Sequence, residues 1–180
     1  MDDLRLIEAI TSGDRDAFRS LVEREQNPVF RTCYRVLGRV ADAEDVTQET
    51  FVIAFRSIGT YRGEGTLGAW LGRIATRQAL RRLGQRREIL SIDASGAALE
   101  TPGGQDPLGL AIAAERAARV RTAVAALGEP YRETVAMRFF AELSLNEIAE
   151  QTGRPLGTVK THLHRGLSRL RETMGREVAA

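Results

Sequence analysis

Apolar side chains recur at helical spacing along most of this chain of 180 residues. Phe18, Leu21 and Val22 share one helical face, and Val46 and Thr50 begin another. Residues that repeat every three or four positions mark one face of an α-helix, whereas strands alternate every second residue. No segment combines sustained alternation with an enrichment in β-branched residues. The spacing therefore predicts an all-α fold.

The helical periodicity breaks in the middle of the chain. The segment SIDASGAALETPGGQDPLG, residues 91–109, is rich in Gly, Ser, Pro and Ala, which is the composition of a flexible linker. We therefore expect two small helical domains joined by this linker. An N-terminal helical bundle would cover residues 1–88, the linker residues 89–114, and a C-terminal domain residues 115–180.

The composition indicates an ordinary soluble protein, with 43% hydrophobic and 28% charged residues. No apolar run is long enough to span a membrane, and the N-terminus MDDLRLIEAI lacks the order of a signal peptide. We therefore expect a cytoplasmic protein with no direct membrane insertion and no cofactor. Cys33 is the only cysteine and has apolar neighbours at helical spacing, which predicts a core residue and not a metal ligand.

The charged residues are sorted along the chain. Residues 73–87 carry six arginines and no acid, residues 88–115 carry only acids, and residues 154–171 are basic again. The net charge is only +2, so the sorting is more informative than the total. Such segregation predicts separate binding surfaces.

A helix-turn-helix motif is predicted in the C-terminal domain. Ser144 and Glu147 have the spacing of a capping box, which begins a helix by satisfying its free N–H groups. Gly153 lies where a tight turn requires positive φ. Pro155 would then open a longer second helix. A short helix, a turn with glycine and a longer helix are typical of this DNA-binding motif.

The outer face of the longer helix is predicted to bind DNA. Val159, Leu163 and Leu170 would pack inward, which leaves hydrogen-bond donors and no carboxylate outside. Such donors read base edges in the major groove and neutralise phosphates. The predicted contacts are Gly157, Thr158, Lys160, Thr161, His164 and Arg165. The alternative is a solvated basic face, and no metal site is expected because His162 and His164 point to different sides.

A second nucleic-acid surface is predicted in the N-terminal domain. Aromatic rings that stack on bases, beside arginines that hold phosphates, are typical of single-strand binding. The residues with this makeup are Tyr61, Arg62, Trp70, Arg73, Arg77 and Arg81. Trp70 also belongs to an apolar stripe, so we expect at least half of it to be buried.

The stretch DAEDVTQETF, which begins at Asp42, is crowded with carboxylates. Asp42 can cap a helix, and Asp45 would lie in the first turn, where the helix dipole favours a carboxylate. These roles do not account for Glu49. Gln48 and Val52 extend the same expected exposed side of the helix. An acidic face beside two basic surfaces indicates docking to a basic protein and not to DNA.

Four stretches together carry a family resemblance: DAEDVTQETF, WLGRIATR, LGEPYRE and LSLNEIAEQTGRPLGTVKTHLHRG. In this order they resemble the extracytoplasmic-function sigma factors, the smallest members of the sigma-70 family. The resemblance extends over nearly the whole chain. It implies a transcription initiation factor, not an enzyme, that binds core RNA polymerase, directs it to specific promoters and promotes DNA opening. It also implies a response to stress or another signal, under control of an anti-sigma factor.

The resemblance also implies a role for each predicted surface. The acidic helix would bind the clamp of the polymerase β′ subunit, with the β subunit as a further partner. The residues of this helix are Asp42, Asp45, Gln48, Glu49 and Val52. The aromatic and arginine-rich segment would engage the minus-ten element of the promoter and hold a flipped base. The outer face of the second motif helix would read the minus-thirty-five element.

The chain departs from the family pattern at two positions and leaves two other classes of protein open. It has Arg77 where the family often has Asn, and Arg81 where Asp commonly follows. A stand-alone helix-turn-helix regulator would share the C-terminal motif and would usually dimerise on paired half-sites. A nuclease is disfavoured because the basic regions lack clustered Asp, Glu or His to hold magnesium or zinc.

Overall fold

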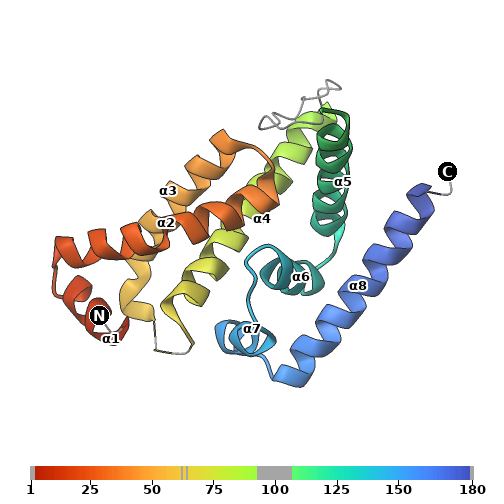
Figure 1. Ribbon diagram of the computed structural model, residues 1–180. Helices are drawn as coiled ribbons and strands as arrows, with labels where there is room; N and C mark the ends of the chain where they lie inside the picture. Colours follow the sequence, from red (N-terminus) through yellow and green to blue (C-terminus); the bar gives the residue numbers. More distant parts are fainter. Residues whose placement is uncertain (1–2, 62, 64, 93–106, 179–180) are drawn as a thin grey trace.

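The protein is built from helices that pack in two groups (Figure 1). The computed structural model describes residues 3–61, 63, 65–92 and 107–178. None of these residues lies in a β-strand, so the prediction of an all-α fold is confirmed. The elements are α1 (Asp3–Thr11), α2 (Arg15–Leu37), α3 (Val40–Ser57), a 3-10 helix η1 (Ile58–Thr60), α4 (Leu67–Ile92), α5 (Pro107–Ala126), α6 (Tyr131–Phe139), α7 (Leu145–Thr152) and α8 (Leu156–Val178).

The first group is a helical bundle in which α2, α3 and α4 pack around an apolar centre. Leu21 and Val36 of α2, Val46 of α3 and Leu71 of α4 are fully buried there. Each such aliphatic side chain contributes about 1.5–3 kcal/mol relative to an exposed one. Cys33 is buried in the same core, as predicted.

Local signals in the sequence set both ends of α2. The carboxylate of Asp14 accepts hydrogen bonds from the backbone N–H groups of Asp16 and Ala17, at 2.9 and 3.1 Å. These bonds satisfy donors that the first turn of a helix leaves free. Gly38 ends the helix with φ of 73°, a left-handed conformation in which a side chain would be unfavourable.

The second group contains α5 to α8, and α7 with α8 forms the predicted helix-turn-helix. The Ser144 hydroxyl accepts a hydrogen bond from the N–H of Glu147, whose side chain accepts one from the N–H of Ser144. Gly153 then turns the chain with φ of 65°. Val159 and Leu170 of α8 are buried, in line with the predicted inward face.

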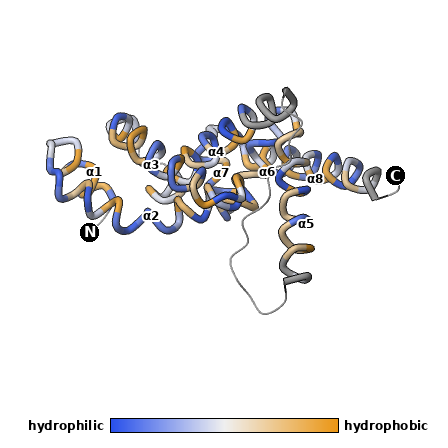
Figure 2. Tube along the Cα trace, turned by 90° about the horizontal axis from the view of Figure 1, so that it is seen from above, coloured by the Kyte–Doolittle hydropathy of each residue, from blue (hydrophilic) through white to orange (hydrophobic). Residues whose placement is uncertain are grey.

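The two groups pack directly against each other. Ala69 of α4 shares an apolar cluster with Met137 of α6, Leu143, Ile148 of α7 and Val159 of α8. Figure 2 shows α4, α6 and α7 gathered near the middle of the molecule, with apolar segments among them. Helix α4 is therefore covered on two sides, by its own bundle and by the helix-turn-helix group.

Helices occupy both ends of the segment that was expected to be a linker, residues 89–114. Helix α4 continues to Ile92, and α5 begins at Pro107. Proline suits the first position of a helix, and the following stretch LGLAIAAERAA is rich in the good helix formers Leu and Ala. The middle of the expected linker, residues 93–106, lies outside the described residues.

The expected capping role of Asp42 is wrong. Helix α3 begins at Val40, with Arg39 at the cap position, and the Arg39 side chain makes no capping hydrogen bond. Asp42 lies instead within the first turn, where the helix dipole still favours its carboxylate. Its carboxylate also lies 4.0 Å from the guanidinium of Arg39.

Gly166 permits close contact between α8 and α6. A Cβ at this position would lie 2.7 Å from Cγ2 of Val135, which is buried and stiff because it is β-branched. We expect Gly166→Ala to lower the free energy of unfolding by about 1–3 kcal/mol in urea denaturation. Gly175→Ala on the same helix meets nothing within 4 Å and should be neutral or stabilise by up to about 1 kcal/mol. Equal effects of both substitutions would contradict this packing.

Candidate functional site

The acidic residues of α3 lie on the outside of the bundle, as predicted. The exposed members of this face are Asp45, Gln48, Glu49 and Val52. Val46 and Thr50 on the opposite face of the same helix are fully buried. Asp42 is less open, with 24% of its side chain exposed. The helical period therefore separates a carboxylate-rich outer surface from the core.

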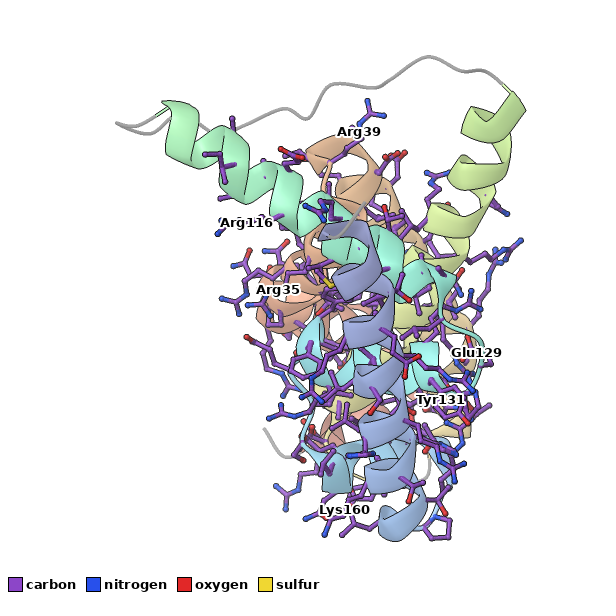
Figure 3. All side chains as sticks on the ribbon, turned by 90° about the vertical axis from the view of Figure 1, so that its right-hand side faces the viewer. Arg35, Arg39, Arg116, Glu129, Tyr131 and Lys160 are labelled. Atoms are coloured by element: carbon purple, nitrogen blue, oxygen red, sulfur yellow. The ribbon has the colours of Figure 1, made fainter. Side chains whose placement is uncertain are left out.

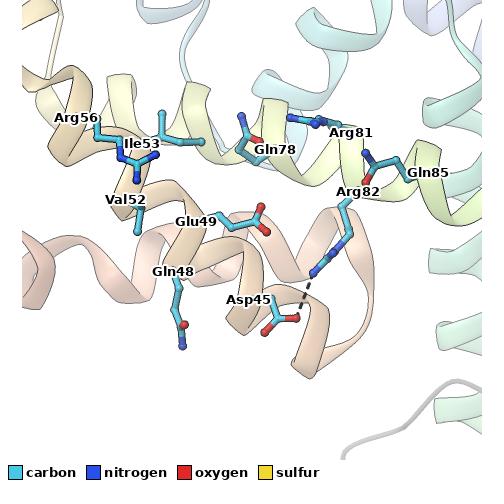
Figure 4. A pocket seen from close by; sticks show the side chains of 10 residues that line it. All are labelled: Asp45, Gln48, Glu49, Val52, Ile53, Arg56, Gln78, Arg81, Arg82 and Gln85. Atoms are coloured by element: carbon cyan, nitrogen blue, oxygen red, sulfur yellow. Dashed lines mark hydrogen bonds and ion pairs between the residues drawn. The ribbon is translucent and has the colours of Figure 1, made fainter.

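A groove of about 600 Å³ separates this acidic face from α4 (Figure 4). Asp45 and Glu49 line its α3 wall, and Arg81 and Arg82 line its α4 wall. Nη2 of Arg82 lies 3.1 Å from Oδ2 of Asp45, across the groove. The surface thus presents carboxylates beside guanidinium groups. Sequence reasoning missed Arg82 here because it is distant from Asp45 along the chain.

An apolar patch continues the acidic face. Phe55 is 54% exposed and lies one helical turn after Val52, which is 48% exposed. The Phe55 ring packs edge-on against Phe18 of α2, with centroids 4.9 Å apart. Exposed apolar side chains that adjoin polar ones are typical of protein-binding surfaces. The helical spacing after Val52 is the sequence signal that could have added Phe55 to the predicted face.

The predicted single-strand surface is organised by the pair of rings of Tyr61 and Trp70. Their centroids lie 5.8 Å apart in an edge-to-face arrangement. Trp70 is only 9% exposed, which confirms the expectation that it is largely a core residue. The Tyr61 hydroxyl donates a hydrogen bond to the carbonyl of Gly65. Arg62 lies outside the described residues.

The arginines of α4 lie beside the second helical group. Nε of Arg73 is buried without a hydrogen-bond partner in the described part of the chain. Burial and the nearby charges of Arg77 and Arg154 lower the pKa of Arg73. Nε of Arg77 donates to Oε1 of Glu133 at 2.7 Å, so one departure from the family pattern makes an ion pair. Arg81 is exposed and has no ion pair with any described residue.

The outer face of α8 presents donors without an acid. The exposed residues of this face are Lys160, Thr161, His164 and Arg165. Figure 3 shows Lys160 near the lower end of α8. Gly157 is open, because a Cβ there would meet nothing within 4 Å, whereas Thr158 is half-buried. The structure therefore gathers the predicted DNA-facing residues on one side of the helix.

His162 is part of the packing of α8 and does not pair with His164. Its ring lies edge-on to Tyr131, with centroids 5.7 Å apart. Burial, together with the charges of Arg154 and Arg165, lowers the pKa of His162 and favours the neutral ring. Among the described residues, no three His, Cys, Asp or Glu side chains lie close enough together to hold a metal ion.

Two protein-family models match the chain. Residues 21–89 match Sigma-70 region 2, and residues 117–170 match Sigma-70, region 4. The first range contains the acidic face and most of α4. The second contains the helix-turn-helix.

Relatives match along nearly the whole chain. It is 32% identical over 176 residues to the ECF RNA polymerase sigma factor SigW of Bacillus subtilis, which covers 93% of this chain and 94% of that protein. It is 34% identical over 173 residues to the ECF RNA polymerase sigma-E factor of Haemophilus influenzae, which covers 92% and 91%.

Two solved structures share the fold. CnrH in complex with the cytosolic domain of CnrY matches with a TM-score of 0.62 over 97% of both chains, at 21% identity. The sigma factor RpoE in complex with the anti-sigma factor NepR from Bartonella quintana matches with a TM-score of 0.54 over 88% of this chain and 96% of that one, at 18% identity.

The chain belongs to the extracytoplasmic-function group of the sigma-70 family. Members of this family are transcription initiation factors that bind core RNA polymerase and promoter DNA. The protein is therefore a sigma factor and not an enzyme, and it is not a stand-alone regulator. In the ranges that the structure describes, none of the helices combines the length and the apolar character needed to cross a lipid bilayer.

Burial of Cys33 makes a direct prediction about thiol chemistry. Burial raises the pKa of the Cys33 thiol to about 11. At pH 8 only about one thiol in a thousand would then be the reactive thiolate. We expect native protein to react with Ellman's reagent far more slowly than protein unfolded in urea, whose thiol has a pKa of about 8.5. Glutathione in the same buffers is the control, and equal rates for native and unfolded protein would contradict the burial.

Proposed function

We propose that the acidic face of α3 docks on the β′ clamp of core RNA polymerase, with the β subunit as a further contact. The docking residues are Asp42, Asp45, Gln48, Glu49 and Val52. The exposure of four of them opposite a fully buried stripe supports this role. Phe55 extends the face with apolar area, which a protein partner can bury.

The minus-ten element is assigned to the loop before α4 and to α4 itself. The residues are Tyr61, Arg62, Trp70, Arg73, Arg77 and Arg81. The mostly buried Trp70 positions the Tyr61 ring, and the arginines supply positive charge for a single strand. The minus-thirty-five element is assigned to the outer face of α8, whose residues are Gly157, Thr158, Lys160, Thr161, His164 and Arg165.

Within the chain, residues 1–88 would dock on polymerase and engage the minus-ten element, and residues 115–180 would read the minus-thirty-five element. Residues 89–114 would connect the two. The matches of residues 21–89 and 117–170 to two separate regions of the family support this division. The observation that carries the proposal is the exposure of an acidic face and an acid-free basic face on two different regions of one chain.

Energetics explain why such a chain requires polymerase to open DNA. Opening about four base pairs costs roughly 6 kcal/mol, at about 1.4 kcal/mol for each stacking step. Holding one or two flipped bases on a protein surface returns roughly 1–3 kcal/mol each. Two bases held at the upper value only match this cost, so the N-terminal domain alone has no surplus and contacts made by the polymerase must drive the opening.

We propose further that the protein acts in the cytoplasm and that an anti-sigma factor controls it. A solved sigma factor of similar fold, RpoE, is in complex with the anti-sigma factor NepR, which supports this mode of control. Stress or another signal would then release the chain to polymerase.

Substitutions on one proposed binding face should leave binding by the other face intact. Lys160→Ala with Arg165→Ala removes two exposed donors from α8, so transcription from promoters mapped with the wild-type chain should be lost. Binding to core polymerase, measured by co-purification, should stay at the wild-type level.

Asp45→Lys with Glu49→Lys inverts the docking charge and should weaken polymerase binding by on the order of ten-fold or more.

Glu8→Lys with Glu172→Lys is the matched control for the charge reversal. Both residues are exposed and lie outside the proposed surfaces, and the net charge changes by the same amount. This control should leave polymerase binding unchanged. Loss of polymerase binding in the Lys160 and Arg165 variant would show that the faces are wrongly assigned.

The free chain should bind promoter DNA weakly and lose affinity as salt rises. Fluorescence anisotropy should give a slope of log affinity against log salt of roughly −0.9 for each phosphate neutralised. Lys160→Ala should reduce the magnitude of this slope by about one. Tight, sequence-specific binding by the free chain at physiological salt would contradict the dependence on polymerase.

A further inference from the structure

Glu133 is the only charged residue that is buried among those that the structure describes. Its side chain is 7% exposed and lies between two guanidinium groups. Arg77 contacts one carboxylate oxygen at 2.7 Å, and Arg154 contacts the other at 3.2 Å. A carboxylate this buried is stable only with such partners, and the removal of one partner is costly.

The pair between Arg77 and Glu133 joins the two helical groups, whereas the pair between Glu133 and Arg154 lies within the second group. Arg77 lies on α4 in the N-terminal bundle, whereas Glu133 lies on α6 and Arg154 in the turn of the helix-turn-helix. A groove of about 580 Å³ surrounds the contact and is also lined by Arg81 and Arg132. The buried carboxylate of Glu133 therefore sits among arginines contributed by both helical groups.

Helix α7 covers the proposed minus-ten surface at the same interface. A cavity of about 290 Å³ has Tyr61, Trp70 and Arg73 on one side and Glu150 of α7 on the other. The loop and α7 are in close contact, because a Cβ at Gly65 would lie 2.7 Å from Oε2 of Glu150. The carboxylate of Glu150 occupies space beside the rings and would repel a DNA phosphate there.

A second polar bridge between the groups is weaker than the one at Glu133. Arg35 of α2 lies 2.9 Å from Glu142 and donates to the carbonyl of Phe140 at 3.2 Å. The hydrogen bond and charge of Arg35 lower the pKa of Glu142. Because Glu142 is on the surface, water and salt screen this pair. Glu133 is therefore the polar contact that matters most to the packing of the two groups.

We infer that Glu133 is an internal substitute for a DNA phosphate and holds the free chain in a closed state. Its carboxylate pairs with the guanidinium of Arg77, while α7 covers Tyr61 and Arg73. A phosphate offers the same kind of oxygen acceptors to a guanidinium, so promoter DNA and Glu133 compete for Arg77. The part of the minus-ten surface formed by Tyr61 and Arg73 becomes fully accessible only when the two helical groups separate. The inference rests on the proposed minus-ten role of α4 and adds a residue that controls access to it.

Glu133→Gln tests this inference because it keeps the side-chain size and removes the charge. Small-angle X-ray scattering should show a larger radius of gyration than in the wild type. Anisotropy with a short fluorescent single-stranded DNA of mixed sequence should show about ten-fold tighter binding, because a larger fraction of the chain is open. Glu129→Gln is the matched control. Glu129 lines the same groove but pairs with Arg132 of its own group, and the amide oxygen of glutamine can keep the hydrogen bond that Glu129 accepts from the N–H of Glu133, so neither quantity should change.

Arg77→Gln removes the partner of Glu133 on the other helical group and should also expand the chain, which guards against a folding defect specific to Glu133→Gln. The DNA affinity of Arg77→Gln is uninformative, because Arg77 is itself a proposed DNA contact. Circular dichroism identifies the variants that stay folded. If the folded variants do not expand, closure by Glu133 is overturned, whatever DNA binding does. If Glu133→Gln expands but its DNA binding does not rise, the minus-ten role of α4 is overturned while the closure stands. Equal expansion of Glu129→Gln would also overturn the inference.

Discussion

The burial of α4 on two sides is the constraint on which the rest of the structure depends. Leu71 and Ala75 of this helix lie in the core shared with α2 and α3, and Ala69 packs into the cluster formed with Met137 and Ile148. A helix that is apolar around much of its circumference must be covered on all those sides. Both helical groups therefore assemble on α4, and the charges that its arginines meet are set by this packing.

The arginines of α4 pair with an exposed acid on one side of the helix and with a buried acid on the other. On the outer side Arg82 pairs with Asp45, whose side chain is 64% exposed, so the proposed docking on polymerase can replace this pair at little cost. On the inner side Arg77 pairs with buried Glu133, a contact that persists until the packing itself opens. One helix thus connects the surface proposed to dock on polymerase with the surface proposed to bind the minus-ten element, which the inferred closed state covers in part.

Local patterns in the sequence predict much of this structure. Apolar periodicity predicts the helices, the pair Ser144 and Glu147 predicts the capping box, and the acid-free run predicts the exposed face of α8. The roles of those exposed residues remain predictions.

What the sequence does not predict depends on contacts between distant segments. In the sequence, Glu133 looks like an ordinary acid in the first turn of α6, a position that the helix dipole favours. Its partner Arg77 lies 56 positions away in the chain. The start of α3 has no capping residue to mark it, which explains the wrong role for Asp42.

The most direct test of the closed free chain is double electron–electron resonance between spin labels introduced by Glu8→Cys and Arg171→Cys. Both positions are exposed, and native Cys33 is buried and stays unlabelled. The free chain should give a single narrow distance that core polymerase replaces with a longer one, whereas the same distance distribution with and without polymerase would contradict the closed state.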